Sequence, residues 1–381
     1  MPTHSAATYS TADGPNIGGE VNSTAKLGGI GQSVWLDNIT RDLLNSGKLE
    51  RYITDLSVTG LTSNPSIYDK AIGGSSDYDE SIRKLAAEGA TPETIFFELA
   101  LDDLRRAADL FLPVYRRTNG VDGFVSLEVS PLLANDAATT AADAARLHAL
   151  AARPNFFIKI PGTTAGRKAI EQTIFAGVPV NVTLLFSTEQ YLAAAEAYTR
   201  GIERRVEAGL NPYVPSVASV FVSRWDGPLA GDLPADLHLK LGIATAQLTY
   251  NAYAELIHGD RWGRLMNEGA RPQRLLWAST GTKDKTASDV LYVEALAAPL
   301  TVNTMPEETL LAFADHGKVS YLMQARPDMP GPALMAGFTA AGVDLADLAR
   351  RLQEAGVESF ATAWRSLLTR IDQTAAAVSA S

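Results

Sequence analysis

Residues 156–162 of this 381-residue chain read FFIKIPG and are the clearest sign of a buried parallel strand. Five of these seven residues are bulky apolar side chains or proline, as in a strand that is buried on both faces of a parallel sheet. Lys159 stands at its centre. An ammonium taken out of water without a partner is costly, so we expect a neutral, nucleophilic amine here. The alternative is a side chain that follows the apolar wall to solvent or pairs with a carboxylate.

Seven further short apolar runs have the character of strands. They are SVWLD (33–37), LSVTGLT (56–62), FVSLEVS (124–130), VPVNVTLLF (178–186), VPSVASVFV (214–222), RLLWAST (274–280) and LTVNT (300–304). Long amphipathic stretches separate most of them, which predicts repeated βα units and a parallel sheet. Eight repeats without a linker in mid-chain favour one α/β domain, a (β/α)8 TIM barrel over residues 31–375, with an open doubly wound sheet as the alternative.

Two segments stand outside this repeat. Residues 66–120 predict extra helices inserted after the second strand, the clearest being TPETIFFELALDDLRRAADLF (91–111), with Thr91 before Pro92 as its N-cap. Residues 1–30 are small, polar and rich in glycine, without the apolar core of a signal peptide or a membrane helix. We expect them to form a flexible N-terminal tail.

Composition and charge exclude several classes of partner and cofactor. The net charge of −10 and the pI near 5.1 argue against nucleic acid or a membrane as partner. The chain has no cysteine, its five histidines are far apart in sequence, and it carries neither a dinucleotide fingerprint nor a P-loop. We therefore expect no metal and no cofactor, and a location in the reducing cytoplasm.

A barrel of this kind carries its chemistry at the carboxyl ends of its strands, where the sequence places many polar residues. They are Asp37, Thr62, Asn64, Glu128, Lys159, Asn181, Thr183, Ser219, Arg224, Ser279 and Lys283. Each has a structural alternative when taken alone: Asp37 as a helix cap, Asn64 as a turn residue before proline, Asn181 and Thr183 as satisfied core groups. Two carboxylates, a lysine and several amides around one barrel mouth instead indicate an acid–base site around a nucleophile.

Six motifs carry a family resemblance. They are TSNPSIY (62–68), SLEVSPLLAND (126–136), FIKIPGTTAG (157–166), VNVTLLFSTEQ (180–190), ASVFVSRWD (218–226) and LLWASTGTKD (275–284). In this order, across most of residues 31–305, the chain resembles the transaldolases. The resemblance implies a class I, Schiff-base enzyme of the pentose phosphate pathway. Such an enzyme moves a dihydroxyacetone unit from sedoheptulose 7-phosphate or fructose 6-phosphate to glyceraldehyde 3-phosphate or erythrose 4-phosphate.

The resemblance also implies roles. Lys159 matches the lysine that condenses with the donor's keto group, and Asp37 matches the carboxylate that takes the proton of the donor's C4 hydroxyl. Glu128 and Thr183 match the pair that holds a water for forming and hydrolysing the imine. Substrate-binding positions are matched by Thr62, Asn64, Asn181, Ser219, Phe221, Arg224, Ser279 and Lys283, with Arg224 on the phosphate.

One departure and two alternatives accompany the resemblance. Many relatives carry an arginine soon after the alanine–serine of the seventh strand. Here three residues, 280–282, separate Ser279 from Lys283, the next cationic residue. A fructose 6-phosphate aldolase would release dihydroxyacetone, but Glu128 and Phe221 stand where those relatives tend to carry glutamine and tyrosine. An inactive phosphosugar-binding barrel need not have kept Lys159, Asp37 and Glu128 together.

Overall fold

The computed structural model describes residues 22–229, 233–326 and 328–379. Its strands are β1 (Gln32–Asp37), β2 (Val58–Thr62), β3 (Val125–Glu128), β4 (Phe156–Pro161), β5 (Val180–Leu185), β6 (Ser216–Phe221), β7 (Arg274–Ala278) and β8 (Thr301–Met305). Each strand overlaps one of the eight runs expected from the sequence. The strand positions are therefore confirmed.

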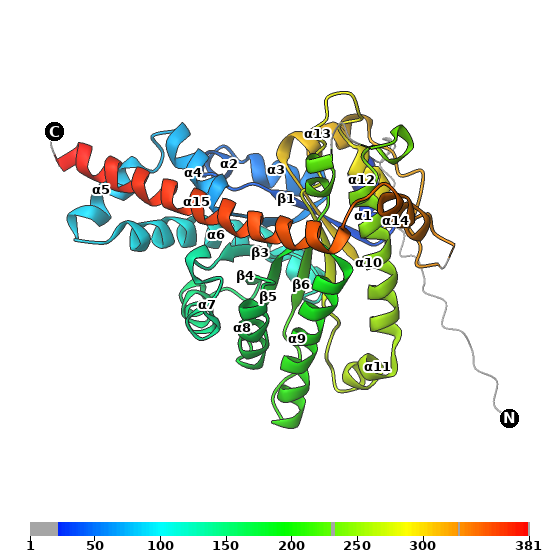
Figure 1. Ribbon diagram of the computed structural model, residues 1–381. Coiled ribbons are helices and arrows are strands. Elements are labelled where there is room, and N and C mark those ends of the chain that lie inside the picture. Colours follow the sequence, from blue (N-terminus) through cyan, green and yellow to red (C-terminus); the bar gives the residue numbers. More distant parts are fainter. Residues whose placement is uncertain (1–21, 230–232, 327, 380–381) are drawn as a thin grey trace.

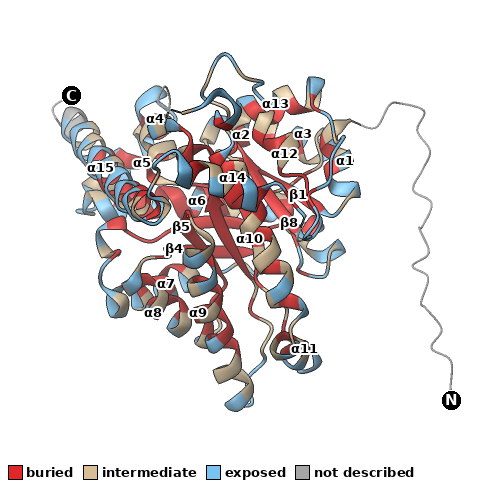
Figure 2. Ribbon diagram, turned by 45° about the vertical axis from the view of Figure 1, so that its right-hand side comes forward, coloured by how far each residue is buried: buried red, intermediate tan, exposed pale blue. Residues whose placement is uncertain are grey.

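The strands form one parallel sheet in the order β2-β1-β8-β7-β6-β5-β4-β3. Its two outer strands meet, because the backbone N–H of Leu61 donates to the carbonyl of Phe124 at 2.9 Å and that of Gly123 donates to Thr59 at 2.9 Å. The sheet thus curls into a (β/α)8 barrel, and the open doubly wound alternative is wrong. Figure 2 shows the strands as the buried centre of the molecule, inside a shell of helices whose outer faces are exposed.

Three residues with left-handed backbone set strand ends that the sequence analysis placed differently. Ser57 has φ 54° directly before β2, Ser279 has φ 56° directly after β7, and Leu300 has φ 60° directly before β8. Such a conformation breaks the extended ladder and is costly for residues with a Cβ atom. The runs 56–62, 274–280 and 300–304 were therefore each predicted slightly too long at one end.

The α-helices are α1 (Ser23–Gly29), α2 (Arg41–Asn45), α3 (Lys48–Asp55), α4 (Pro65–Gly74), α5 (Asp79–Ala87), α6 (Pro92–Arg117), α7 (Ala137–Ala151), α8 (Thr164–Phe175), α9 (Thr188–Glu207), α10 (Leu241–His258), α11 (Asp260–Asn267), α12 (Leu291–Ala295), α13 (Glu307–His316), α14 (Gly331–Ala340) and α15 (Leu345–Ser379). Short 3-10 turns are η1 (Pro131–Leu133), η2 (Ser223–Trp225), η3 (Gly227–Leu229) and η4 (Ala235–Leu237). Within the described ranges, no helix combines the length and apolar character that a membrane crossing requires.

The insertion after β2 contains α4, α5 and α6, as the sequence predicted. Thr91 caps α6, since its hydroxyl accepts from the backbone N–H of Thr94 at 3.2 Å, and Pro92 occupies the first turn. Of the segment expected to be a tail, residues 1–21 lie outside the described residues. Residues Ser23–Gly29 form α1, which packs on β1 and α13 with Leu27 buried.

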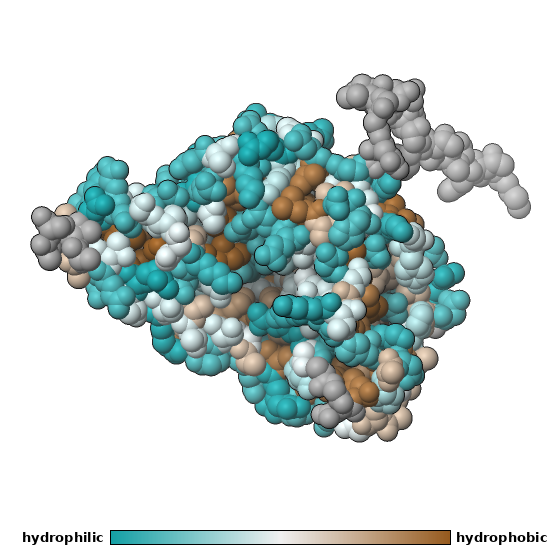
Figure 3. All heavy atoms as spheres, turned by 90° about the horizontal axis from the view of Figure 1, so that it is seen from above, coloured by the Kyte–Doolittle hydropathy of each residue, from teal (hydrophilic) through white to brown (hydrophobic). Residues whose placement is uncertain are grey.

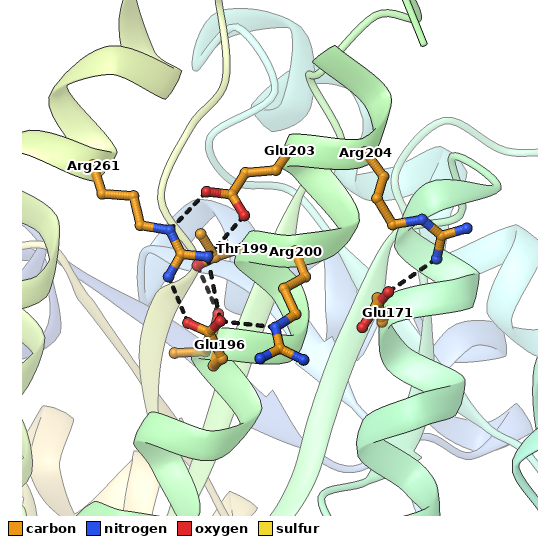
Figure 4. A network of polar contacts seen from close by, with 8 residues as sticks. Glu171, Glu196, Thr199, Arg200, Glu203, Arg204 and Arg261 are labelled. Atoms are coloured by element: carbon orange, nitrogen blue, oxygen red, sulfur yellow. Dashed lines mark hydrogen bonds and ion pairs between the residues drawn. The ribbon is translucent and has the colours of Figure 1, made fainter. Parts of the chain in front are cut away.

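Charged side chains tie neighbouring outer helices together on the flank of the barrel (Figure 4). Arg261 of α11 donates to Glu203 of α9 at 2.7 Å through each of two nitrogens, and to Glu196 of α9 at 2.6 Å. The other side of α9 is joined to α8, because Arg204 of α9 donates to Glu171 of α8 at 3.0 Å. These bonds hold the helices that follow β4, β5 and β6 in register, away from the mouth of the barrel.

The last helix departs from the repeat. In Figure 1, α15 runs as a long helix over the ends of β3 to β6, past α4, α5 and α6. It contacts α4, α5, α6 and β5. This segment from the far end of the chain therefore covers part of the carboxyl ends of the strands.

On the face seen in Figure 3, hydrophilic residues predominate and the hydrophobic residues form separate small areas.

Candidate active site

A cavity of about 430 Å³ opens at the carboxyl ends of the strands. From the residues predicted above, its lining includes Asp37, Thr62, Asn64, Lys159, Thr183, Ser219, Phe221, Arg224, Ser279 and Lys283. Glu128 and Asn181 do not line it and lie buried behind this layer. The barrel brings the predicted set together because parallel strands end at the same rim.

Lys159 lies in the interior of this site, with 5% of its surface exposed. Its Nζ donates to the carbonyl of Ser63, after β2, at 2.9 Å. It lies 3.4 Å from Oε2 of Glu128 on the neighbouring strand, and 5.8 Å from the ring centroid of Phe360 on α15. The carboxylate pairing that the sequence left open is present, and the amine remains part of the cavity wall.

Glu128 and Thr183 flank this lysine from either side of β4. In the parallel register Glu128 pairs with Lys159, and Thr183 pairs with Pro161. Burial raises the pKa of the Glu128 carboxyl, although the charge of Lys159 opposes that shift. Within the described part of the chain, neither Glu128 oxygen nor the Thr183 hydroxyl has a hydrogen-bond partner. Buried polar groups of this kind are normally bonded to water or ligand.

Asp37, at the end of β1, is held by a short chain of hydroxyls. Thr62 donates to Oδ1 of Asp37 at 2.7 Å, and its oxygen lies 2.7 Å from that of Thr304 at the end of β8. Burial raises the pKa of Asp37, whereas Lys159, the Thr62 hydrogen bond and Arg224 each act to lower it. Asp37 does not cap a helix, since Thr40 caps α2.

Asn181 is the centre of a buried hydrogen-bond chain across three strands. Its Nδ2 donates to the hydroxyl of Ser126 in β3 at 3.1 Å, and its Oδ1 accepts from Ser219 in β6 at 2.7 Å. The amide is thus oriented by partners on both sides, with Ser219 on the cavity wall. Asn64 combines two roles, because its side chain caps α4 through the N–H of Ile67 at 3.2 Å while it lines the cavity.

Two cationic side chains from loops that follow strands, Arg224 and Lys283, line the cavity. Arg224 follows β6 and lies with its guanidinium carbon 5.1 Å from the ring centroid of Phe221, and Lys283 follows β7. Burial and the charge of Arg224 lower the pKa of Lys283, and burial lowers that of Arg224. Neither side chain forms an ion pair with any described residue closer than 4 Å. The hydroxyls of Ser223 and Ser279 lie 3.0 Å apart and join the two loops.

Several residues that line or support the cavity escaped the sequence analysis, and four of them show why. Thr304 ends the run 300–304, so the strand-end rule that found Asp37 was sufficient to find it. Ser126 lies within β3 and Lys70 within α4, where no local signal marks them. Phe360 comes from α15 and lines the cavity beside Lys159. Among the residues in the described ranges, no group of three or more His, Asp or Glu side chains gathers to hold a metal ion.

Comparison with known proteins identifies the family of the chain. The profile of the family described as Transaldolase/Fructose-6-phosphate aldolase matches residues 34–371. A protein named Transaldolase from Thiobacillus denitrificans is 43% identical over 360 residues, covering 92% of this chain and 100% of the relative. One from Mycolicibacterium smegmatis is 43% identical, covering 94% and 96%. One from Saccharopolyspora erythraea is 44% identical, covering 91% and 95%. Because the match covers most of the barrel, from within β1 to within α15, this chain belongs to the transaldolase/fructose-6-phosphate aldolase family.

Proposed function

We propose that this enzyme transfers a dihydroxyacetone unit from a ketose phosphate to an aldose phosphate through a Schiff base on Lys159. The observation that carries the proposal is the environment of the Lys159 amine, which is buried, 3.4 Å from the Glu128 carboxylate and part of a cavity wall shared with Asp37. A nucleophile, a partner carboxylate and a second carboxylate are the parts that such a reaction needs. The relatives named Transaldolase support the same activity.

Imine formation begins at Lys159. Its amine attacks the keto carbon of the donor, and the carbinolamine loses water to give an iminium. We assign Glu128 and Thr183 to the water of this step and of the reverse hydrolysis. Their support is structural, because both are buried, lie on the strands adjoining β4, and have polar oxygens without a hydrogen-bond partner among the described residues.

Carbon–carbon cleavage requires a base at the donor's C4 hydroxyl. We assign Asp37, whose carboxylate takes that proton while the C3–C4 electrons move into the iminium and leave an enamine on Lys159. The aldose phosphate departs, the enamine attacks the acceptor aldehyde, and Asp37 returns the proton. The hydrogen bond from Thr62 to Oδ1 fixes one oxygen of Asp37 and leaves Oδ2 for the substrate.

The phosphate is assigned to Arg224, with Lys283 beside it. Both cations line the cavity, and neither has an ion-pair partner within 4 Å among the described residues, so a dianion would neutralise them. The Ser223–Ser279 hydrogen bond links the loops that carry them, which supports Lys283 as the substitute for the arginine of other relatives. In this proposal the sugar faces Thr62, Asn64, Ser219, Phe221 and Ser279, and Asn181 acts from behind the wall by accepting the hydrogen bond of Ser219.

Sugar phosphates are the proposed small-molecule partners, and the cysteine-free sequence supports a cytoplasmic setting. The net charge of −10 disfavours nucleic acid. The family description covers both transfer of the three-carbon unit and its release. Transfer is favoured here by the names of the relatives and by Phe221, which presents an apolar ring and no hydroxyl to the cavity.

Borohydride reduction in the presence of fructose 6-phosphate, followed by peptide mass mapping, tests the nucleophile and the substrate class together. We expect one adduct, on the peptide that contains Lys159, and none in Lys159→Ala. Lys168→Ala, an exposed lysine of α8, is the matched control and keeps both trapping and turnover. An adduct on another lysine, or turnover in Lys159→Ala, contradicts the mechanism.

The same preparation separates transfer from release. With fructose 6-phosphate and erythrose 4-phosphate supplied together, a transferase forms sedoheptulose 7-phosphate and little free dihydroxyacetone. Free dihydroxyacetone as the main product, at the same rate with and without acceptor, assigns the aldolase activity instead. Absence of both products together with absence of trapping identifies an inactive sugar-phosphate-binding barrel.

A further inference from the structure

Helix α15 is fixed to the barrel mouth by specific contacts. Nε2 of Gln353 donates to the carbonyl of Leu184, at the end of β5, at 2.9 Å. On the same side, Gln190 of α9 donates to the carbonyl of Ala349 at 3.3 Å. The first bond joins α15 to β5 itself, and the second joins α15 to α9, the helix that follows β5. Together with the packing of α15 on α4, α5 and α6, these two bonds hold the helix over the cavity.

A glycine brings the helix close to the barrel. A Cβ atom added at Gly356 would lie 3.0 Å from Cδ2 of Leu184, a spacing tighter than ordinary van der Waals contact. Residues three and four apart share one face of a helix, so Gln353, Gly356 and Phe360 point the same way. The close approach at Gly356 therefore carries Phe360, one turn later, down into the cavity.

Phe360 ends this face directly above the reactive amine. Its ring centroid lies 5.8 Å from Nζ of Lys159, it is 4% exposed, and it lines the cavity. The ring belongs to an apolar cluster with Leu184, Phe186 and Phe221, which reaches the other side of the cavity wall. Lys159 is thus covered by an apolar ring from an element outside the strand–helix repeat.

We propose that Phe360 is a specificity-determining residue that keeps water from the enamine on Lys159 and so favours transfer over release. This inference rests on the proposed Schiff-base function of Lys159. A ring at this distance also interacts favourably with a cation, so it stabilises the iminium form of the lysine as well as excluding solvent. Phe360 does not replace the water held at Glu128 and Thr183, which the imine steps require.

The competing reaction shows what the ring must prevent. After the aldose phosphate has left, protonation of the enamine carbon gives an iminium again. One water adds to its carbon, the C–N bond breaks, and free dihydroxyacetone and the Lys159 amine result, with the proton returned to solvent. Capture by the acceptor aldehyde forms a C–C bond instead. The two fates begin from the same enamine, so their ratio reports how well that enamine is shielded.

The experiment measures free dihydroxyacetone against transferred product at a fixed acceptor concentration. We expect Phe360→Ala to raise this ratio about tenfold or more, equivalent to about 1.4 kcal/mol between the two barriers. Phe360→Leu keeps apolar bulk without a π face, so a ratio near that of the wild type assigns the effect to water exclusion. A rise in Phe360→Leu equal to that in Phe360→Ala assigns it to the ring face.

Controls separate this effect from loosened packing and from failure of the mechanism. Leu352→Ala removes a buried side chain of α15 that does not line the cavity, and it should leave the ratio unchanged while lowering Tm. Borohydride trapping at Lys159 should persist in every variant. An unchanged ratio in Phe360→Ala and Phe360→Leu, with trapping intact, overturns the inference alone. Loss of trapping in the wild type overturns the proposed function instead.

Discussion

Nζ of Lys159 lies 3.4 Å from Oε2 of Glu128, with side-chain exposures of 6% and 3%. This pair places two charges in the barrel interior. Removing one partner of a buried ion pair destabilises a protein by more than the intact pair stabilises it, because the remaining charge is left without a counter-charge. The same contact keeps a carboxylate beside the amine that the proposed reaction uses. The stability of the barrel and the proposed chemistry therefore both depend on these two residues.

The first prediction concerns stability. Lys159→Met retains the apolar stem but leaves Glu128 buried without its counter-charge, so we expect a loss of about 3–5 kcal/mol at neutral pH. Burial raises the pKa of Glu128, so the folded state binds its proton more tightly than the unfolded state. Stability of the variant is therefore greatest at acidic pH and falls as pH rises through that raised pKa. Urea unfolding across pH measures this.

The double variant Lys159→Met/Glu128→Gln provides the control for this prediction. It removes the titrating carboxyl while keeping its shape, so the unfolding free energy should recover at neutral pH and depend less on pH. Equal pH dependence in the single and double variants would assign the effect to other groups, Asp37 first, since its pKa is also raised by burial.

The second prediction separates the two carboxylates. Asp37→Asn should still form the borohydride-trapped adduct, but its cleavage of the C3–C4 bond should be slower by about 10²-fold or more, as expected on losing a general base. Glu128→Gln should slow the trapping step itself. Single-turnover kinetics with fructose 6-phosphate distinguishes the two steps, and exchanged phenotypes mean that the roles are exchanged.

The third prediction concerns the hydrogen bond that Asp37 accepts from the Thr62 hydroxyl. The hydrogen bond from Thr62 lowers the pKa of Asp37, so Thr62→Val should raise it. A general base works when ionised, and activity is lost as pH falls through its pKa. The acidic limb of the kcat profile should therefore move to higher pH in Thr62→Val. Thr304→Val keeps the Thr62–Asp37 bond and should move it less.

The fourth prediction concerns Arg224 and Lys283, the two cationic side chains assigned to the phosphate. Arg224→Ala should raise KM for fructose 6-phosphate by about tenfold or more, the worth of a charge-assisted hydrogen bond. The effect on an unphosphorylated donor such as fructose should be much smaller. Lys283→Ala should act in the same direction to a smaller extent. Steady-state kinetics with both donors decides this, and equal effects on them would place these residues away from the phosphate.

The fifth prediction tests the cavity wall at Phe221. Ser219 and Phe221 stand two residues apart on β6, and both line the cavity. Phe221→Tyr adds a hydroxyl near the proposed imine water, so the product ratio should shift toward free dihydroxyacetone. Phe221 also packs 5.4 Å from Phe186 between ring centroids. An unchanged ratio in a well-folded variant would limit Phe221 to that packing.

Local sequence pattern was enough to predict the strands and the barrel, and it nominated most of the candidate site residues. Eight short apolar runs mark eight buried strands because a strand buried on both faces has no polar alternation, and Lys159 stands out as the exception in one of them. Once the barrel was inferred, its strand ends placed Asp37, Asn64 and Arg224 at one mouth. The fold prediction succeeded because it depends on local pattern and on a topological rule, whereas the roles of the site residues stay predictions.

Which of these side chains are in contact depends on how the distant segments pack in the folded protein. The Lys159–Glu128 pair, the Thr62–Asp37 bond and the Ser126–Asn181–Ser219 chain depend on strand register, which local pattern does not specify. Phe360 was beyond sequence reasoning for a further reason. The periodicity of α15 shows that one face is buried but not against what, and the docking is set by Gly356 and Gln353 meeting a strand end more than 160 residues earlier in the chain. Contacts between distant segments are fixed by packing of the whole fold.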